Sequence, residues 1–182
     1  QECIVKTACR PFVVLIALAG IFLGLDCLGI DPRVEAPGPD GALAVDAGPM
    51  TRVEESYLEV IVHHLQTVSD YIASLEMLFG SPDIDDENWR ASVTVLLNRI
   101  ESAYGSVATL EPTERLQAFQ DASASALAHA AAFAALLRDM LVVGETTLTE
   151  EADRERVATA EAFGAAERLL MDFLQAHPVP EE

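Results

Sequence analysis

His64 and Glu167 are the two polar residues of this sequence that fall near the middle of otherwise apolar helical faces. At 1.5 Å per residue, His64 is about 18 Å from the start of its predicted helix and Glu167 about 15 Å from the end of its own. Antiparallel helices would bring them nearly level. Because an unpaired buried carboxylate costs several kcal/mol, we predict a hydrogen bond between the two side chains. Such a pair would fix the helix register, or it would form a proton relay or ligand site.

The other histidines and carboxylates do not follow the spacings of known metal or haem centres. No glutamate lies three residues before any histidine, and the chain has no CxxC, CxxCH or HExxH motif. His64 and His129 do not converge on their predicted helices, and Glu59 and His63 share an outward face. The acidic residues 83–87 lack the ligand pattern of an EF-hand, so we expect a solvated turn there. We therefore predict no catalytic residue, no metal site, no cofactor and no enzymatic activity.

Three tyrosines, Tyr57, Tyr71 and Tyr104, lie on predicted apolar helical faces. A tyrosine in this position usually packs its ring in the core and directs its hydroxyl to a partner at the rim. We interpret all three as core residues.

The most apolar stretch of the chain runs from Pro11 to Ile30, and its first fifteen residues carry no charge. A membrane span needs about 20 apolar residues, so we predict a transmembrane helix over 11–30, with Asp26 at the level of the headgroups. A secretory signal peptide is the alternative, but no small-x-small cleavage pattern follows the apolar run. A lipoprotein signal at Cys27 is disfavoured because Asp26 stands where a small residue is needed.

Charges on either side of this stretch predict its orientation. Lys6 and Arg10 precede it, whereas the residues that follow are mostly acidic. The positive-inside rule puts the N-terminus in the cytoplasm and the remainder on the extracytoplasmic, periplasmic side of the cell membrane. Gly20 and Gly24 form a GxxxG pair that would let another transmembrane helix pack closely, unless the spacing is accidental.

Composition separates the rest of the chain into a linker and an acidic domain. Residues 31–50 contain four prolines and three glycines, which predicts an extended linker. The formal net charge of −19 resides after the anchor and argues against nucleic acid as a partner. All three cysteines precede residue 28, so no disulfide is expected in the domain.

Hydrophobic periodicity predicts four helices within residues 51–177. The first begins with a capping box at Thr51 and Glu54 and ends at about Phe79, and the second follows Asp85 or Asp86 and ends near Leu110. The third covers about 112–143, with a line of small residues that permits close packing, and the fourth starts at Thr147 or Thr149 and closes before Pro178.

The apolar face of the first helix is wider than one neighbouring helix would cover. Its predicted line includes Val53 and Val60, and Leu58, Val62 and Leu65 widen it. This surplus is either a broad core face or a docking surface.

These elements predict an all-α protein with an N-terminal transmembrane helix, a Pro/Gly-rich linker and an antiparallel up-down-up-down four-helix bundle. The expected division is a cytoplasmic stub (1–10), an anchor (11–30), a linker (31–50), the bundle (51–177) and a tail (178–182).

We expect a non-catalytic accessory subunit of a larger bacterial membrane complex. An electron-transfer assembly, respiratory or photosynthetic, is favoured by architectural analogy, with other membrane subunits and the lipid bilayer as partners of the anchor and linker. The alternative is a stand-alone anchored bundle that binds a metal or small ligand.

Overall fold

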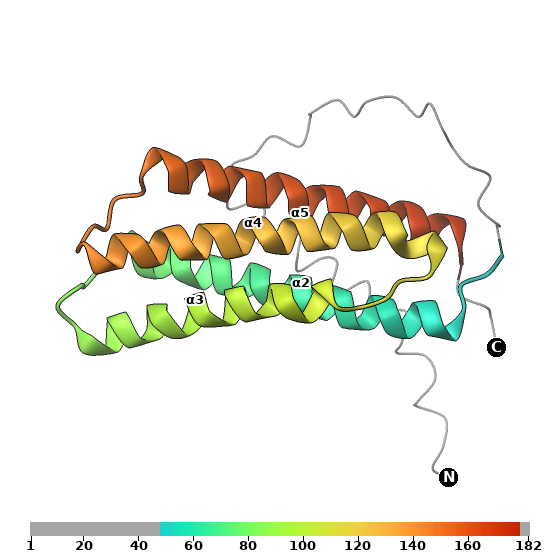
Figure 1. The fold of residues 1–182 in the computed structure, drawn as a ribbon, viewed down its shortest axis with the longest axis horizontal. Helices are drawn as coiled ribbons and strands as arrows, with labels where there is room; N and C mark the ends of the chain where they lie inside the picture. Colours follow the sequence, from blue (N-terminus) through green and yellow to red (C-terminus); the bar gives the residue numbers. More distant parts are fainter. Residues whose placement is uncertain (1–47, 179–182) are drawn as a thin grey trace, which may run out of the picture.

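The protein is described by a computed structural model that places residues 48–178, and these residues fold into four helices with no strand among them (Figure 1). The helices are α2 (Arg52–Gly80), α3 (Glu87–Ala108), α4 (Gln117–Val142) and α5 (Glu150–Ala176), and a short 3-10 turn, η1 (Glu114–Leu116), precedes α4. This arrangement is consistent with the predicted four-helix bundle. The predicted transmembrane helix with Gly20 and Gly24, and most of the predicted linker, lie outside the described residues.

Helix boundaries follow the predicted capping signals closely. Thr51 caps α2 in a reciprocal capping box with Glu54, the side chain of Asp86 caps α3, and Thr149 caps α5. Gly144 takes a φ of +74° just after α4, a left-handed conformation that glycine adopts without steric cost. The third helix is the exception, because the segment predicted to begin it near Pro112 forms a turn and the α-helix starts only at Gln117.

Side-chain contacts show that consecutive helices run antiparallel. Arg99 of α3 reaches Tyr71 of α2, and Arg138 of α4 reaches Glu101 of α3. His129 of α4 contacts Glu155 of α5. The start of α2 and the end of α5 therefore lie at one end of the rod (Figure 1). We call this end, with Gly48–Met50, the linker end, and the opposite end, with the α2–α3 and α4–α5 connections, the distal end.

The core is a continuous apolar cluster to which every helix contributes. The helix α4 packs against α2, α3 and most extensively α5. Its inner line contains Ala126, Ala130 and Ala134, all fully buried, and small side chains let two helices approach closely. The predicted line of small residues on this helix is thus the face that packs against the other helices.

The buried face of α2 is rotated from the predicted one. Val53 and Val60, placed on the inner line by the sequence, are 70% and 44% exposed. Leu58, Val62 and Leu65, predicted as the widening edge, are buried instead. The width of the apolar face is therefore explained by core packing, since α2 is covered by both α3 and α4.

One described helix, Glu114–Val142, is long and apolar enough to cross a membrane by length and composition alone, with a mean hydropathy of 1.4. Core helices of water-soluble bundles meet the same criterion, and this segment packs on three other helices. Its hydropathy follows from its many alanines, which serve the close contact with α5.

Candidate functional site

His64 and Glu167 do not form the predicted hydrogen bond, and no ion pair joins them among the interactions of the described residues. The predicted register is compatible with the structure. Glu54 and His177 both contact Arg115 at the linker end, and Glu76 and Arg156 line one pocket at the distal end. Between these two matches, residue 64 is level with residue 167. The register along the helices therefore does not explain the missing contact.

His64 lies on the side of α2 that faces α3 and α4. Tyr57 and Tyr71 are seven residues before and after it, about two helical turns in each direction, and so share its side of the helix. The Tyr57 hydroxyl contacts Gln120 of α4, and the Tyr71 hydroxyl accepts a 3.4 Å hydrogen bond from Arg99 of α3. The side of α2 directed at α5 carries Glu76 instead, about 120° around the helix from His64.

The pKa directions of the two residues also disagree with an ion pair. Burial lowers the pKa of His64, and the neighbouring His63 adds to the effect. Burial raises the pKa of Glu167, and Arg168 only partly offsets it. A His64–Glu167 ion pair would shift both pKa values the other way.

Tyr57 forms a hydrogen-bond chain across three helices. Its hydroxyl donates to Oε1 of Gln120 at 2.6 Å, and Nε2 of the buried Gln120 donates to the Val107 carbonyl oxygen of α3 at 2.9 Å. Burial, with a contribution from Asp121, raises the pKa of Tyr57 to about 12. The chain confirms the expected packed ring with a bonded hydroxyl for Tyr57 and satisfies a glutamine inside the core. The same prediction is wrong for Tyr104, which is 40% exposed.

Replacing Tyr57 by phenylalanine is expected to lower the free energy of unfolding by about 1–2 kcal/mol, because Oε1 of buried Gln120 loses its donor. Urea unfolding followed by the fluorescence of Trp89, the only tryptophan, measures this change. Tyr104→Phe is the matched control, since Tyr104 is exposed, and it should change the free energy by less than about 0.5 kcal/mol. Equal effects of the two substitutions would contradict the proposed role of the Tyr57 hydroxyl.

Among residues 48–178, the most buried charged group lies at the linker end, where Glu54 is 2% exposed. Arg115, in the 3-10 turn before α4, donates from Nε to Oε1 of Glu54 at 2.8 Å and from Nη2 to Oε2. This is the bidentate arrangement that a guanidinium and a carboxylate favour. Thr113 donates a further hydrogen bond to Oε1, and the Thr51 backbone N–H donates to Oε2. The carboxylate is therefore fully satisfied.

Electrostatics at this group agree with its geometry. Arg115 is the largest cause that lowers the pKa of Glu54 from 4.5 to about 2, and the hydrogen bonds of Thr51 and Thr113 add to it. Burial acts in the opposite direction but is outweighed. Glu54 is thus held as a carboxylate inside the protein.

Arg115 also fixes the chain that precedes the bundle. Its Nη1 donates to the Gly48 carbonyl oxygen at 3.1 Å and its Nη2 to the Pro49 carbonyl oxygen at 3.3 Å. Nδ1 of His177, just past the end of α5, lies 2.8 Å from the same Gly48 oxygen and 3.2 Å from Nη1 of Arg115. Met50 is buried in the core. The last three residues of the predicted linker are therefore packed on the bundle, and we call this group the linker-end network.

Neither Arg115 nor His177 was predicted as a site residue from the sequence. Glu54 was explained by its capping role, although it precedes Leu58 and Ile61 by four and seven residues and so continues their apolar line. A carboxylate at such a position requires a cationic partner. That signal could have pointed to an arginine in a connection at the same end of the bundle.

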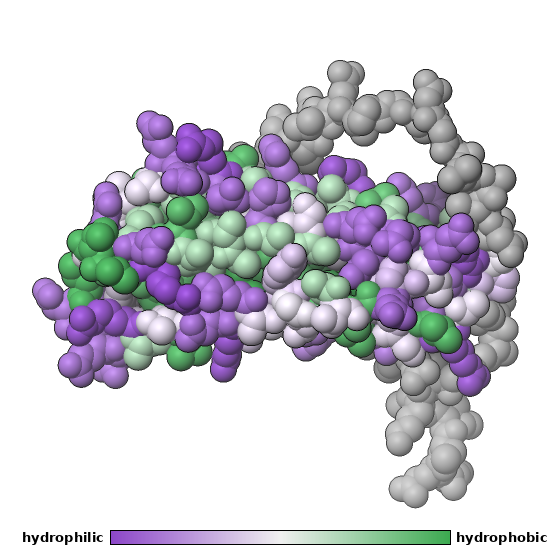
Figure 2. All heavy atoms as spheres, viewed as in Figure 1, coloured by the Kyte–Doolittle hydropathy of each residue, from purple (hydrophilic) through white to green (hydrophobic). Residues whose placement is uncertain are grey.

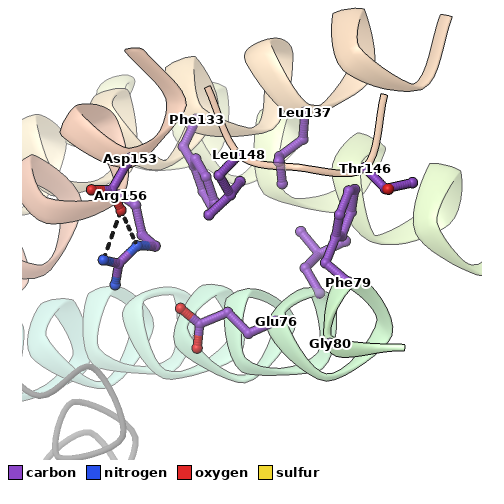
Figure 3. A pocket seen from close by; sticks show the side chains of 10 residues that line it. Glu76, Phe79, Gly80, Phe133, Leu137, Thr146, Leu148, Asp153 and Arg156 are labelled. Atoms are coloured by element: carbon purple, nitrogen blue, oxygen red, sulfur yellow. Dashed lines mark hydrogen bonds and ion pairs between the residues drawn. The ribbon is translucent and has the colours of Figure 1, made fainter. Parts of the chain in front are cut away.

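A pocket of about 320 Å³ opens at the distal end between α2 and the start of α5 (Figure 3). Its apolar wall comes from α2, α4 and the α4–α5 connection and consists of Leu75, Phe79, Phe133, Leu137 and Leu148. Its polar side holds Glu76 opposite Arg156, which donates from Nε and Nη2 to Oδ1 of Asp153 at 3.0 and 2.8 Å (Figure 3). Burial raises the pKa of Glu76, and Arg156 only partly offsets this. The pocket thus combines an apolar wall with a net negative rim.

Metal ligands do not gather in the described residues, where no group of three or more His, Cys, Asp and Glu side chains is placed to hold an ion. His129 pairs with Glu155 at 2.9 Å on a partly exposed surface, and His63 is exposed.

No protein-family model, curated protein or solved structure matches the chain. The geometry of the chain itself therefore carries the functional argument.

Proposed function

We propose that this protein is a non-catalytic, membrane-anchored accessory subunit of a larger bacterial membrane complex. In this proposal residues 11–30 cross the cell membrane, with the N-terminus in the cytoplasm, and the bundle lies on the periplasmic side. An electron-transfer assembly is the narrower form of the proposal and rests on architectural analogy. The anchor and linker bind the other subunits, and the rod covers an external surface.

The linker-end network is the observation that supports this proposal. Arg115 and His177 bind the backbone of Gly48, which belongs to the last three residues of the predicted linker. A domain that rotated freely on a flexible linker would need no such contacts between the linker and the bundle. Because Met50 is also buried, the direction in which the chain leaves the bundle is fixed. A fixed direction of the chain at this point suits a subunit whose bundle must face its partners in one orientation.

Membrane fractionation of the full chain tests the anchor. Native protein should stay in the membrane pellet after alkaline carbonate extraction, with residues 1–30 present by mass spectrometry. Leu18→Arg places a charge at the centre of the apolar run, at a cost of about 3 kcal/mol, and should move much of the protein to the soluble fraction. Leu28→Arg, near the predicted headgroups, is the matched control and should stay membrane-bound.

Copurification after mild detergent extraction tests the accessory role. The chain should elute with other membrane proteins, and the electron-transfer form requires that some of them carry redox cofactors. Mature protein that lacks residues 1–30 would contradict the proposal, as would a monodisperse monomer without partners.

The second candidate is a stand-alone anchored binding protein, and the distal pocket favours it. A volume of about 320 Å³ is at the lower end of the range of small-molecule sites. A bound small molecule in a monomeric preparation would support this candidate over the first.

A further inference from the structure

The distal end exposes large apolar side chains at the ends of α2 and α4 and in the α4–α5 connection. Met77 near the end of α2 is 73% exposed and Val142 at the end of α4 is 81% exposed. Val143 and Leu148 in and beside the α4–α5 connection are also exposed. Apolar atoms lie among hydrophilic ones at this end of the visible face (Figure 2). Their grouping at one end of a rod is typical of an interaction surface.

The distal pocket gives this surface a place for a single anchoring side chain. Leu148 belongs to both features, because it is exposed and lines the pocket, where it lies beside Phe133 (Figure 3). Anchors of protein interfaces are typically one or two large side chains that fill such a pocket, with polar contacts around them. An aromatic or long aliphatic side chain has the size and polarity to occupy it.

Charge decides which partner fits this end. The two connections, residues 80–88 and 143–151, hold seven carboxylates and no lysine or arginine. Asp86 is used as the cap of α3, and Glu150 and Glu151 stabilise the first turn of α5. Glu87 plays the same part in the first turn of α3. The other three, Asp83, Asp85 and Glu145, add negative charge that these roles do not need. A second copy of this chain or an anionic bilayer would be repelled, whereas a basic protein surface would be attracted.

We propose that the distal end docks a segment of another protein that carries one large apolar side chain flanked by lysines or arginines. The apolar side chain enters the pocket beside Phe79 and Leu148. The flanking cations lie over the carboxylates of the two connections and near Glu76 and Asp153. This inference names a partner surface for the attachment proposed above and so rests on that proposal.

Synthetic peptides and two charge-matched variants test the docking surface. The full chain in zwitterionic lipid nanodiscs is titrated with a nine-residue peptide that has four lysines around one central phenylalanine. A second peptide replaces the phenylalanine by alanine, and a third replaces the lysines by glutamates. Leu148→Lys removes apolar contact and adds one positive charge, and Val95→Lys makes the same charge change on an exposed site of α3.

The first peptide should bind, and its dissociation constant should rise about tenfold for the alanine peptide and for the Leu148→Lys protein. The Val95→Lys protein should stay within about twofold of wild type, and the glutamate peptide should not bind. Thermal melts of both variants confirm that the bundle is folded. Equal weakening by the two variants, equal binding of the first two peptides, or no binding of the first peptide would overturn the proposal.

A photo-crosslinking amino acid at position 148 of the full chain in native membranes identifies the occupant. Crosslinks to another chain, at an apolar residue within a few positions of lysine or arginine, support the proposal. Crosslinks to lipid, to a second copy or to another part of the same chain overturn it. Membrane fractionation is independent of these results, so failure of the docking surface and failure of the anchor are distinguishable.

Discussion

Replacing Arg115 by alanine is expected to lower the free energy of unfolding by about 3–5 kcal/mol, the largest effect of any single substitution considered. The change leaves the carboxylate of Glu54, 2% exposed, without its bidentate partner, and an uncompensated buried charge costs several kcal/mol. It also removes the guanidinium hydrogen bonds to the carbonyl oxygens of Gly48 and Pro49. Urea unfolding followed by Trp89 fluorescence at pH 7 measures the loss.

Arg138→Ala is the matched control for this experiment. Arg138 pairs with Glu101 at 2.7 Å, but both side chains are about one-third exposed, so their attraction is screened by solvent. Its removal should cost less than about 1 kcal/mol. In the Arg115→Ala background, Glu54→Gln should recover part of the loss because it removes the stranded charge. If Arg115→Ala and Arg138→Ala were equally mild, the linker-end network would not contribute as described.

The helices of this fold could be predicted because their signals are local. Thr51, Asp86 and Thr149 each precede an apolar periodic run and cap a helix in the structure. The four-helix arrangement followed from helix number and short connections. The rotation of α2 could not be predicted in the same way. Val53 and Leu58 fit a helical period equally well, and only the positions of α3 and α4 decide which of them is buried.

The candidate site depends on contacts between residues far apart in the chain, which periodicity does not report. Glu54 and Arg115 are separated by 61 residues, and His177 and Gly48 by 129. The position of His64 along the helix axis, level with Glu167, was predicted from the rise per residue and is compatible with the structure. The side of α2 on which His64 lies was predicted wrongly. His64 shares a side of the helix with Tyr57 and Tyr71, which contact α4 and α3, and not with residues that face α5.

Acidification should remove about 3 kcal/mol of stability that Glu54 supplies at neutral pH. Its pKa is lowered from 4.5 to about 2, with Arg115 as the first cause, so the folded protein binds this proton more weakly than the unfolded chain. The contribution is therefore complete above pH 4.5 and is lost as the pH falls through about 2. At about 1.4 kcal/mol per pKa unit, the difference between the two pKa values corresponds to this loss.

Comparison with Glu54→Gln isolates this effect from the many other carboxylates. Burial raises the pKa values of Glu76 and Glu167, so protonation of these two groups favours the folded state and opposes the loss from Glu54. Wild type and Glu54→Gln share both groups. The difference in their free energies of unfolding should shrink by about 3 kcal/mol between pH 5 and pH 2. A difference that stays constant over this range would mean that Glu54 is not held as a carboxylate by Arg115.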